Sequence, residues 1–278
     1  MKVCQWLCGG WGRGTCLGLA CLFLMLGTAA AQWRQSEAAV IETLPGGRVD
    51  WTAGLVHSTA QAVPAVRGGA HPSTLDVAVE RARQQLRETL MQLQLDAERT
   101  VGSVVQGAVE QQHLATLVAN AEVSETRYLP RGGVESTIQI PLFGPFTALL
   151  WPQLPAAADI AEPAGDVVHT GIIIDARGLA VQQALFPQIF DDAGQALYAP
   201  ARVRAEMAQQ RGFMVYATAF DSPQIEPRVG KNPLVLRARR VADRGRVNLI
   251  MHQADALRLQ GSAMLQALLA QCRVVIVS

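Results

Sequence analysis

The sequence predicts an α+β protein built from two small mixed domains, the second of them rich in strands. Three observations favour this class. Apolar residues make up 50% of the 278 positions and charged residues 17%, which is typical of a chain that folds around buried cores. Patterns with the period of a strand alternate along the chain with patterns that have the period of a helix. A stretch rich in proline and alanine, residues 145–166, divides the chain near its middle and predicts a linker there.

The first 31 residues have the pattern of a secretory signal peptide. Lys2 and Arg13 precede an uncharged run at 15–26, and small residues follow it up to Ala31. The apolar run is shorter than the roughly 20 residues that a membrane-spanning helix needs. We therefore expect cleavage between Ala31 and Gln32, and export to the periplasm or to the periphery of the outer membrane.

Cleavage would change the charge and the cysteine content of the chain. It removes two of the 24 basic residues and leaves 22 of them against 23 acidic ones. A chain so close to neutral lacks the basic character of nucleic-acid-binding domains, so we expect no nucleic-acid partner. Cys272 is the one cysteine beyond the leader, which excludes an intramolecular disulfide in the exported chain.

The first domain, residues 32–144, is predicted to be a β-α-α-β-β unit in which a small sheet is covered by a long helix. Residues 49–55 alternate between apolar and polar, as in a strand with one buried face. Ser73 and Asp76 have the spacing of a capping box, and a helix of about 23 residues should follow. The apolar positions of this helix recur every three or four residues: Leu75, Val79, Ala82, Leu86, Leu90 and Leu93. A shorter helix is expected at 108–119, followed by an antiparallel hairpin of 121–129 and 134–142.

The second domain, residues 167–278, is predicted to be a strand-rich α+β unit. Its segment 167–175 contains three consecutive isoleucines, which is typical of a strand buried on both faces. Further strands are expected at 184–190, 195–198, 213–219, 234–242, 247–251 and 274–277, and helices at 202–210 and 254–271.

The sequence contains no complete motif for catalysis or for binding a metal or a cofactor. Lys231 follows Gly230, but Ile225 occupies the place where a phosphate-binding loop needs its first glycine. The histidines are isolated from one another in the sequence, and Cys272 is interpreted as a small buried residue between a helix and a strand. We therefore predict a protein that is not an enzyme and that has no cofactor and no metal.

Two charged clusters are candidate sites for a ligand or partner. Asp175 and Arg177 directly follow the isoleucine strand, where polar groups of mixed sheets gather, although a closed turn explains them better. Arg237 and Arg239 should lie on one face of a strand and, with Arg240, Arg244 and Arg246, form a basic stripe. Such a stripe could meet an anionic polymer or a membrane surface, but a solvated hairpin face is the simpler interpretation. No aromatic residues interleave with it, which argues against single-stranded nucleic acid.

The chain also resembles a known family. The helix sequence Ala78-Val79-Glu80-Arg81-Ala82-Arg83 and the hairpin around Val123-Ser124-Glu125-Thr126 and Ile138-Gln139-Ile140 resemble the twenty-kilodalton outer-membrane lipoprotein family. They are also similar to the N-terminal domain of flagellar assembly protein T, over about residues 47–144. Residues 170–179 and 187–191 look like the C-terminal half of exported bacterial proteins of that group. The chain departs from the lipoproteins at Cys21, because Gly18 stands where a lipid-attachment motif has leucine.

The resemblance implies a non-enzymatic envelope protein. Together with the leader, it predicts a protein that acts by binding envelope proteins or an anionic surface polymer, in envelope or flagellar assembly, with peripheral membrane association. The alternative is a periplasmic protein that binds a small ligand, or a weak hydrolase, using Asp175 and Arg177.

Overall fold

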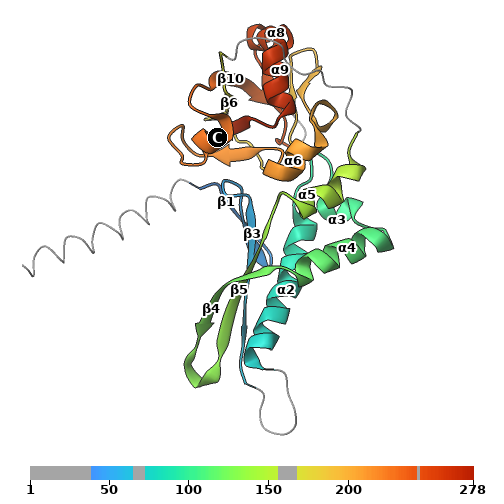
Figure 1. The fold of residues 1–278 in the computed structure, drawn as a ribbon, viewed down its shortest axis with the longest axis vertical. Coiled ribbons are helices and arrows are strands. Elements are labelled where there is room, and N and C mark those ends of the chain that lie inside the picture. Colours follow the sequence, from blue (N-terminus) through green and yellow to red (C-terminus); the bar gives the residue numbers. More distant parts are fainter. Residues whose placement is uncertain (1–38, 65–72, 156–167, 243–244) are drawn as a thin grey trace, which may run out of the picture. The chain divides into compact units, whose positions relative to one another are not determined.

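A computed structural model describes residues 39–64, 73–155, 168–242 and 245–278 (Figure 1). The α+β class is confirmed: the chain forms two sheets, each accompanied by its own helices. The expected leader with its cleavage site at Ala31 and Gln32, the residues 156–166 of the expected linker, and Arg244 lie outside the described residues. From Ala39 to Ser278 the chain forms one compact unit.

The first sheet is antiparallel, with strands in the order β1-β2-β3-β5-β4. The strands are β1 Ile41–Leu44, β2 Gly47–Asp50, β3 Leu55–Ala62, β4 Glu122–Tyr128 and β5 Val134–Pro141. The predicted hairpin of β4 and β5 is confirmed, and β4 forms one edge of the sheet. Buried and partly buried residues alternate strictly along β5, because a helix covers one face of the sheet.

The prediction of a strand over residues 49–55 is wrong. β2 ends at Asp50, and residues 51–54 form a turn before β3 begins at Leu55. The Asp50 carboxylate accepts hydrogen bonds from the backbone N–H groups of Thr52 (3.0 Å) and Ala53 (2.8 Å), and Gly54 adopts a positive φ of 68°. This local hydrogen bonding competes with the strand and reverses the chain, which places the Trp51 indole at the end of the sheet.

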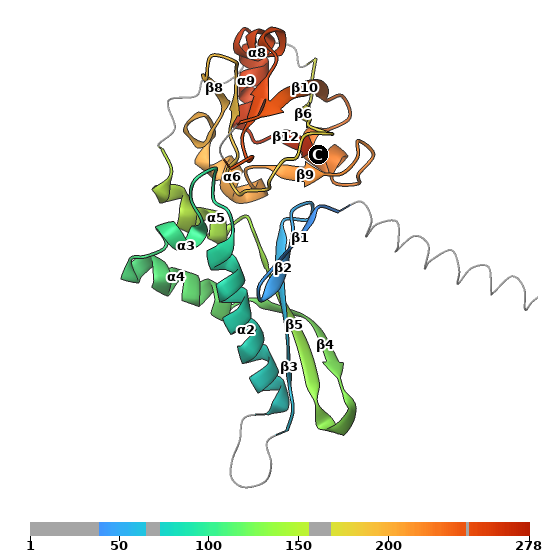
Figure 2. The same cartoon turned by 180° about the vertical axis from the view of Figure 1, so that it is seen from behind.

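The long helix, α2 Thr74–Gln92, covers the inner face of β3 and β5 (Figures 1 and 2). The predicted capping box is present: the Ser73 hydroxyl accepts from the Asp76 N–H at 3.1 Å, and the Asp76 carboxylate accepts from the Ser73 N–H. The helix has 19 residues and ends at Gln92, shorter than predicted. Its stripe of Ala82, Leu86 and Leu90 is fully buried, as the spacing predicts.

Short helices complete the first half of the described chain. These are α3 Val101–Val104, α4 Ala108–Ala119, whose predicted bounds are confirmed, and α5 Pro145–Leu150 followed by a 3-10 turn, η2 Trp151–Gln153. The segment predicted as a linker therefore begins with a helix. Phe146 and Leu150 of that helix are buried, so this part of the segment packs against the core.

The second sheet is mixed, in the order β8-β7-β11-β10-β6-β12-β9. Its strands are β6 Ile172–Asp175, β7 Ile189–Phe190, β8 Ala196–Tyr198, β9 Val215–Ala217, β10 Leu234–Val241, β11 Leu249–Met251 and β12 Val274–Val277. The isoleucine strand β6 lies between β10 and β12 and is parallel to both, as expected of a strand buried on both faces. The strands predicted at 234–242 and 247–251 are present as β10 and β11, which pair antiparallel.

The helices of the second half are η3 Pro200–Arg202, α6 Ala205–Arg211, α7 Ile225–Val229, α8 Gln253–Gln260 and α9 Ala263–Ala270. The helical stretch predicted over 254–271 is present as two helices, because the chain breaks at Gly261 and restarts where the Ser262 hydroxyl accepts a hydrogen bond from the N–H of Leu265. Of the strand predicted over 184–190, only Ile189–Phe190 is a strand in the structure. Within the described ranges, none of the helices combines the length and the apolar character needed to cross a bilayer.

Candidate functional site

The predicted pair Asp175 and Arg177 forms a closed turn at the end of β6. Arg177 donates from Nε to Oδ1 of Asp175 (2.9 Å), from Nη2 to Oδ2 (3.0 Å) and from its backbone N–H to Oδ1 (3.1 Å). The guanidinium also lies over the Phe220 ring, 4.2 Å from its centroid. The hydrogen bond from Arg177 is the main cause that lowers the pKa of Asp175. The two side chains thus satisfy each other, as the turn interpretation expects.

Arg237 and Arg239 lie on the exposed face of β10, where alternate residues are buried and exposed up to a bulge. Arg237 is the register partner of Asp175, and its charge contributes to lowering the pKa of Asp175. Arg239 pairs with Asp192, with 2.5 Å between Nη1 and Oδ2. Arg246 donates to the carbonyl of Ala180 at 2.9 Å. The structure therefore places Asp175, Arg177 and Arg237 close together, whereas Arg239 forms an ion pair with Asp192. The carboxylates of Asp175 and Asp192 thus interrupt the basic stripe.

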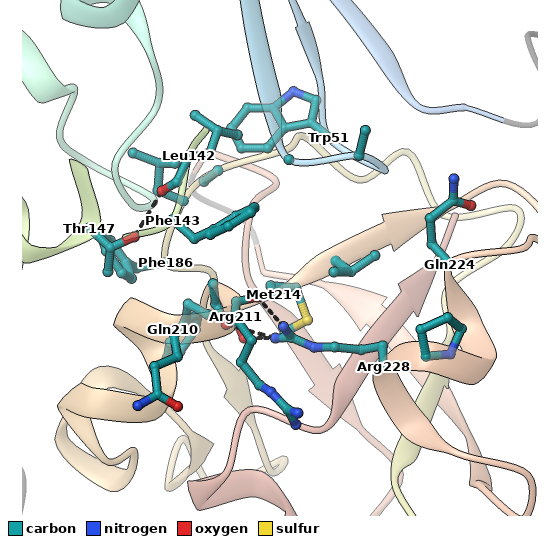
Figure 3. A pocket seen from close by; sticks show the side chains of 18 of the residues that line it. Trp51, Leu142, Phe143, Thr147, Phe186, Gln210, Arg211, Met214, Gln224 and Arg228 are labelled. Carbon is teal, nitrogen blue, oxygen red and sulfur yellow. Dashed lines mark hydrogen bonds between the residues drawn. The ribbon is translucent and has the colours of Figure 1, made fainter. Parts of the chain in front are cut away.

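An apolar cavity of about 420 Å³ is a candidate binding site among the described residues (Figure 3). Its volume lies within the range of small-molecule sites, roughly 300–1,000 Å³. Four separate segments supply the walls: the turn after β2, the start of α5, the chain before β7, and the stretch from the end of α6 to α7. The lining side chains that matter below are Trp51, Phe143, Phe186, Phe213, Met214, Gln210, Arg211, Gln224 and Arg228.

Aromatic contacts hold the apolar walls in place. The Trp51 indole packs edge-on against Tyr216, with ring centroids 5.8 Å apart, and its Nε1 donates to the Glu42 carboxylate at 2.8 Å. Phe213 contacts Phe186 edge-on at 5.5 Å and stacks on Tyr198 at 4.4 Å. Because these rings also pack into the core behind them, the apolar lining is a rigid surface rather than a set of loose side chains.

The cationic end of the cavity is built by Arg228 from α7. Its side chain is 6% exposed, and its guanidinium donates to the carbonyls of Arg211, Gly212 (2.8 Å) and Phe213 (2.9 Å) at the end of α6. Its Nε is buried and has no hydrogen-bond partner among the described residues. Burial lowers the pKa of Arg228, although a guanidinium remains protonated in proteins.

A second polar layer lies behind the cavity wall. The Tyr198 hydroxyl donates to the carbonyl of Phe213 at 2.6 Å, and the Tyr216 hydroxyl bonds to the backbone N–H and carbonyl of Ala184, both at 3.1 Å. Burial raises the pKa values of both phenols, and it raises the pKa of Cys272 to about 11. Cys272 is fully buried, as predicted. These groups are neutral at physiological pH and position the wall.

The cavity offers apolar contacts and a few hydrogen-bonding groups. Its lining contains aromatic and aliphatic side chains, two glutamines and two arginines, and the one hydroxyl, from Thr147, donates to the carbonyl of Leu142 at 2.8 Å. A nucleophile paired with a base is not among the lining residues. Across the described ranges, no three histidine, cysteine, aspartate or glutamate side chains lie close enough together to hold a metal ion.

Sequence reasoning missed this cavity because its walls come from segments far apart in the chain. Trp51 lies in the predicted strand 49–55 and Phe186 in the predicted strand 184–190, and neither pattern indicates that the two side chains share a cavity. Arg228 gives no signal in the sequence, because Glu226 and Lys231 lie close to it and the segment reads as an ordinary polar stretch.

Comparison with known families matches one part of the chain. Residues 171–278 match the family model described as Treponema pallidum Tp0624, second domain, which is less than half of the chain. The match spans the second sheet from β6 to β12. No curated protein gives a match. The cavity takes Phe186, Phe213 and Arg228 from the matched region and Trp51 and Phe143 from the residues before it.

Proposed function

We propose that this protein is a non-catalytic binding protein of the bacterial cell envelope, and that the apolar cavity is its binding site for a small ligand. The observation that carries the proposal is the cavity itself: an apolar volume of about 420 Å³ with rigid aromatic walls and a few polar groups at one end. That combination is typical of pre-formed small-molecule sites. The role in binding agrees with the sequence, which contains no motif for catalysis.

The envelope location rests on the leader and on the family resemblance. In this proposal the exported chain associates peripherally with the membrane, and envelope proteins or an anionic surface polymer are its macromolecular partners. A role in flagellar or envelope assembly belongs to the same proposal. The ligand in the cavity would then be a component of the envelope rather than a cytoplasmic metabolite.

Weak hydrolysis by Asp175 and Arg177 is the less favoured alternative. The carboxylate of Asp175 already accepts three hydrogen bonds from Arg177, which lowers its pKa and makes it a poor general base. The pair also lies outside the residues that line the cavity. A ligand at this turn would have to displace an existing ion pair.

Binding of the neutral apolar dye N-phenyl-1-naphthylamine tests the proposal. We expect a saturable rise in dye fluorescence with one site per chain. Met214→Trp, which places a larger side chain in the cavity wall, should weaken dye binding. Leu257→Trp is the matched control, because Leu257 lies on α8, is 57% exposed and is not a lining residue. Absence of saturable binding, or equal losses in both variants, would contradict the proposal.

A further inference from the structure

We infer that the ligand of the cavity is a single-chain amphiphile with an anionic head group, carboxylate or phosphate, whose head lies toward Arg228 and Arg211 and whose chain lies among the aromatic rings. This inference rests on the proposed function and adds the chemical class of the ligand.

The charge of the lining is the first argument. The ionisable side chains among the lining residues are Arg211 and Arg228, and no aspartate or glutamate is among them. Arg228 is 6% exposed, and the acceptors it contacts are neutral carbonyls. A buried charge is costly unless an opposite charge accompanies it, and carbonyl hydrogen bonds leave the net charge uncancelled. An anionic head group would supply the missing counter-charge.

The hydrogen-bonding capacity of Arg228 is the second argument. Its Nε has no partner among the described residues, although a guanidinium directs five N–H donors in a fixed fork. Carboxylates and phosphates match that fork better than other groups do. Arg211, which is exposed, adds a second positive charge at the same end of the cavity.

The layout of the cavity is the third argument. Figure 3 shows Trp51 and Phe143 on one side of the cavity and Arg211 and Arg228 on the other. At about 30 Å³ for the volume share of a water-sized group, 420 Å³ has room for roughly a dozen heavy atoms. A chain of about that length with a charged end matches both the apolar side and the cationic side.

Arg228 also clamps the end of α6 to α7, and that role is compatible with ligand binding. The clamp uses the two terminal nitrogens on backbone carbonyls, whereas the proposed ligand responds to the uncancelled positive charge of the guanidinium. Because Arg228 variants are expected to lose stability, the decisive test varies the head group of the ligand on the unmodified protein.

The test is displacement of N-phenyl-1-naphthylamine by four ligands with the same twelve-carbon chain, at pH 8 and below their micelle concentrations. The ligands are dodecanoate, dodecyl phosphate, 1-dodecanol and dodecyltrimethylammonium. A charge-assisted hydrogen bond to a buried guanidinium should make at least one of the anions bind about tenfold or more tightly than the alcohol, and the cation weakest. The tighter of the two anions identifies the source of the head group.

Two variants locate the effect. Arg211→Gln should weaken anion binding severalfold relative to binding of 1-dodecanol, whereas Arg202→Gln, an exposed arginine outside the lining, should leave that ratio unchanged. If the alcohol or the cation binds as tightly as the anions while the dye still binds, the inference is overturned and the proposed function stands. If the dye itself does not bind, the proposed function fails.

Discussion

Replacement of Arg228 by methionine should destabilise the protein, because this side chain holds together two segments that the backbone does not join. The guanidinium from α7 donates to the carbonyls of Arg211, Gly212 and Phe213. Methionine keeps much of the aliphatic stem but none of the donors, so the variant isolates the hydrogen-bonding head.

The magnitude follows from the state of each carbonyl after the change. Phe213 keeps its hydrogen bond from the Tyr198 hydroxyl at 2.6 Å, whereas the carbonyls of Arg211 and Gly212 lose the donors that Arg228 supplied. A buried acceptor left without a partner costs about 1–3 kcal/mol. Removal of a buried, uncancelled charge offsets part of that loss. We expect the free energy of unfolding to fall by about 2–4 kcal/mol, so the lost hydrogen bonds outweigh the relieved desolvation.

Urea unfolding followed by far-ultraviolet circular dichroism measures this loss. At a slope of about 2 kcal/mol per M, the midpoint should fall by about 1–2 M. Arg211→Met is the matched control: its side chain is exposed, and the change should stay within about 0.5 kcal/mol. An Arg228→Met variant as stable as the unmodified chain would refute the reasoning, because desolvation of the guanidinium would then cost as much as its hydrogen bonds contribute.

The remaining predictions concern the helix cap, a close backbone approach, the buried thiol and one histidine. Ser73→Ala removes the hydroxyl that caps α2 and should lower the free energy of unfolding by about 1 kcal/mol, measured by urea unfolding. Gly171→Ala should cost about 1–3 kcal/mol in the same assay, because its Cβ would lie 2.4 Å from Cβ of Val229. In a chain beginning at Gln32, Cys272 should react with an aromatic disulfide reagent only after unfolding, since burial raises its pKa to about 11. Burial and the neighbouring Arg48 lower the pKa of His57 below its usual 6.5, so the native state binds this proton less readily than the unfolded state. The free energy of unfolding should therefore fall as the pH decreases from 7 through 6.5, and this slope should flatten in His57→Gln.

Each of these predictions has a control. Ser73→Asp should retain the cap, because aspartate is an equally good N-cap residue. Gly261→Ala should cost less than Gly171→Ala, because its Cβ would lie 3.1 Å from the Leu257 carbonyl oxygen, a milder approach, and its φ of −79° suits alanine. His113→Gln, a change at an exposed position, is the control for His57, and equal flattening in both variants would contradict the assignment to His57. Rapid labelling of Cys272 in the native protein would contradict its burial.

Local signals predicted the elements that depend on local interactions. Ser73 and Asp76 begin α2 because the cap satisfies backbone donors within one turn, and the Leu86 stripe follows from the helical period. The hairpin of β4 and β5 is likewise encoded by alternation around a proline-glycine turn. The local pattern gave a wrong prediction at residues 49–55. Apolar and polar residues do alternate there, but the Asp50 side chain stabilises a turn that reverses the chain.

The sequence by itself determined the α+β class, the long capped helix, the central isoleucine strand and the buried state of Cys272. Each of these depends on residue type and on spacing over a few turns or strands. Only the tertiary structure decided the cavity, because its walls combine Trp51, Phe186 and Arg228 from segments more than forty residues apart, which are brought together by packing of the two sheets with their helices. It also decided that Arg228, unremarkable in the sequence, holds a buried charge with no acid among the residues that line the cavity. The physical reason is that burial and charge compensation depend on all neighbours in space, whereas a sequence pattern reports only neighbours along the chain.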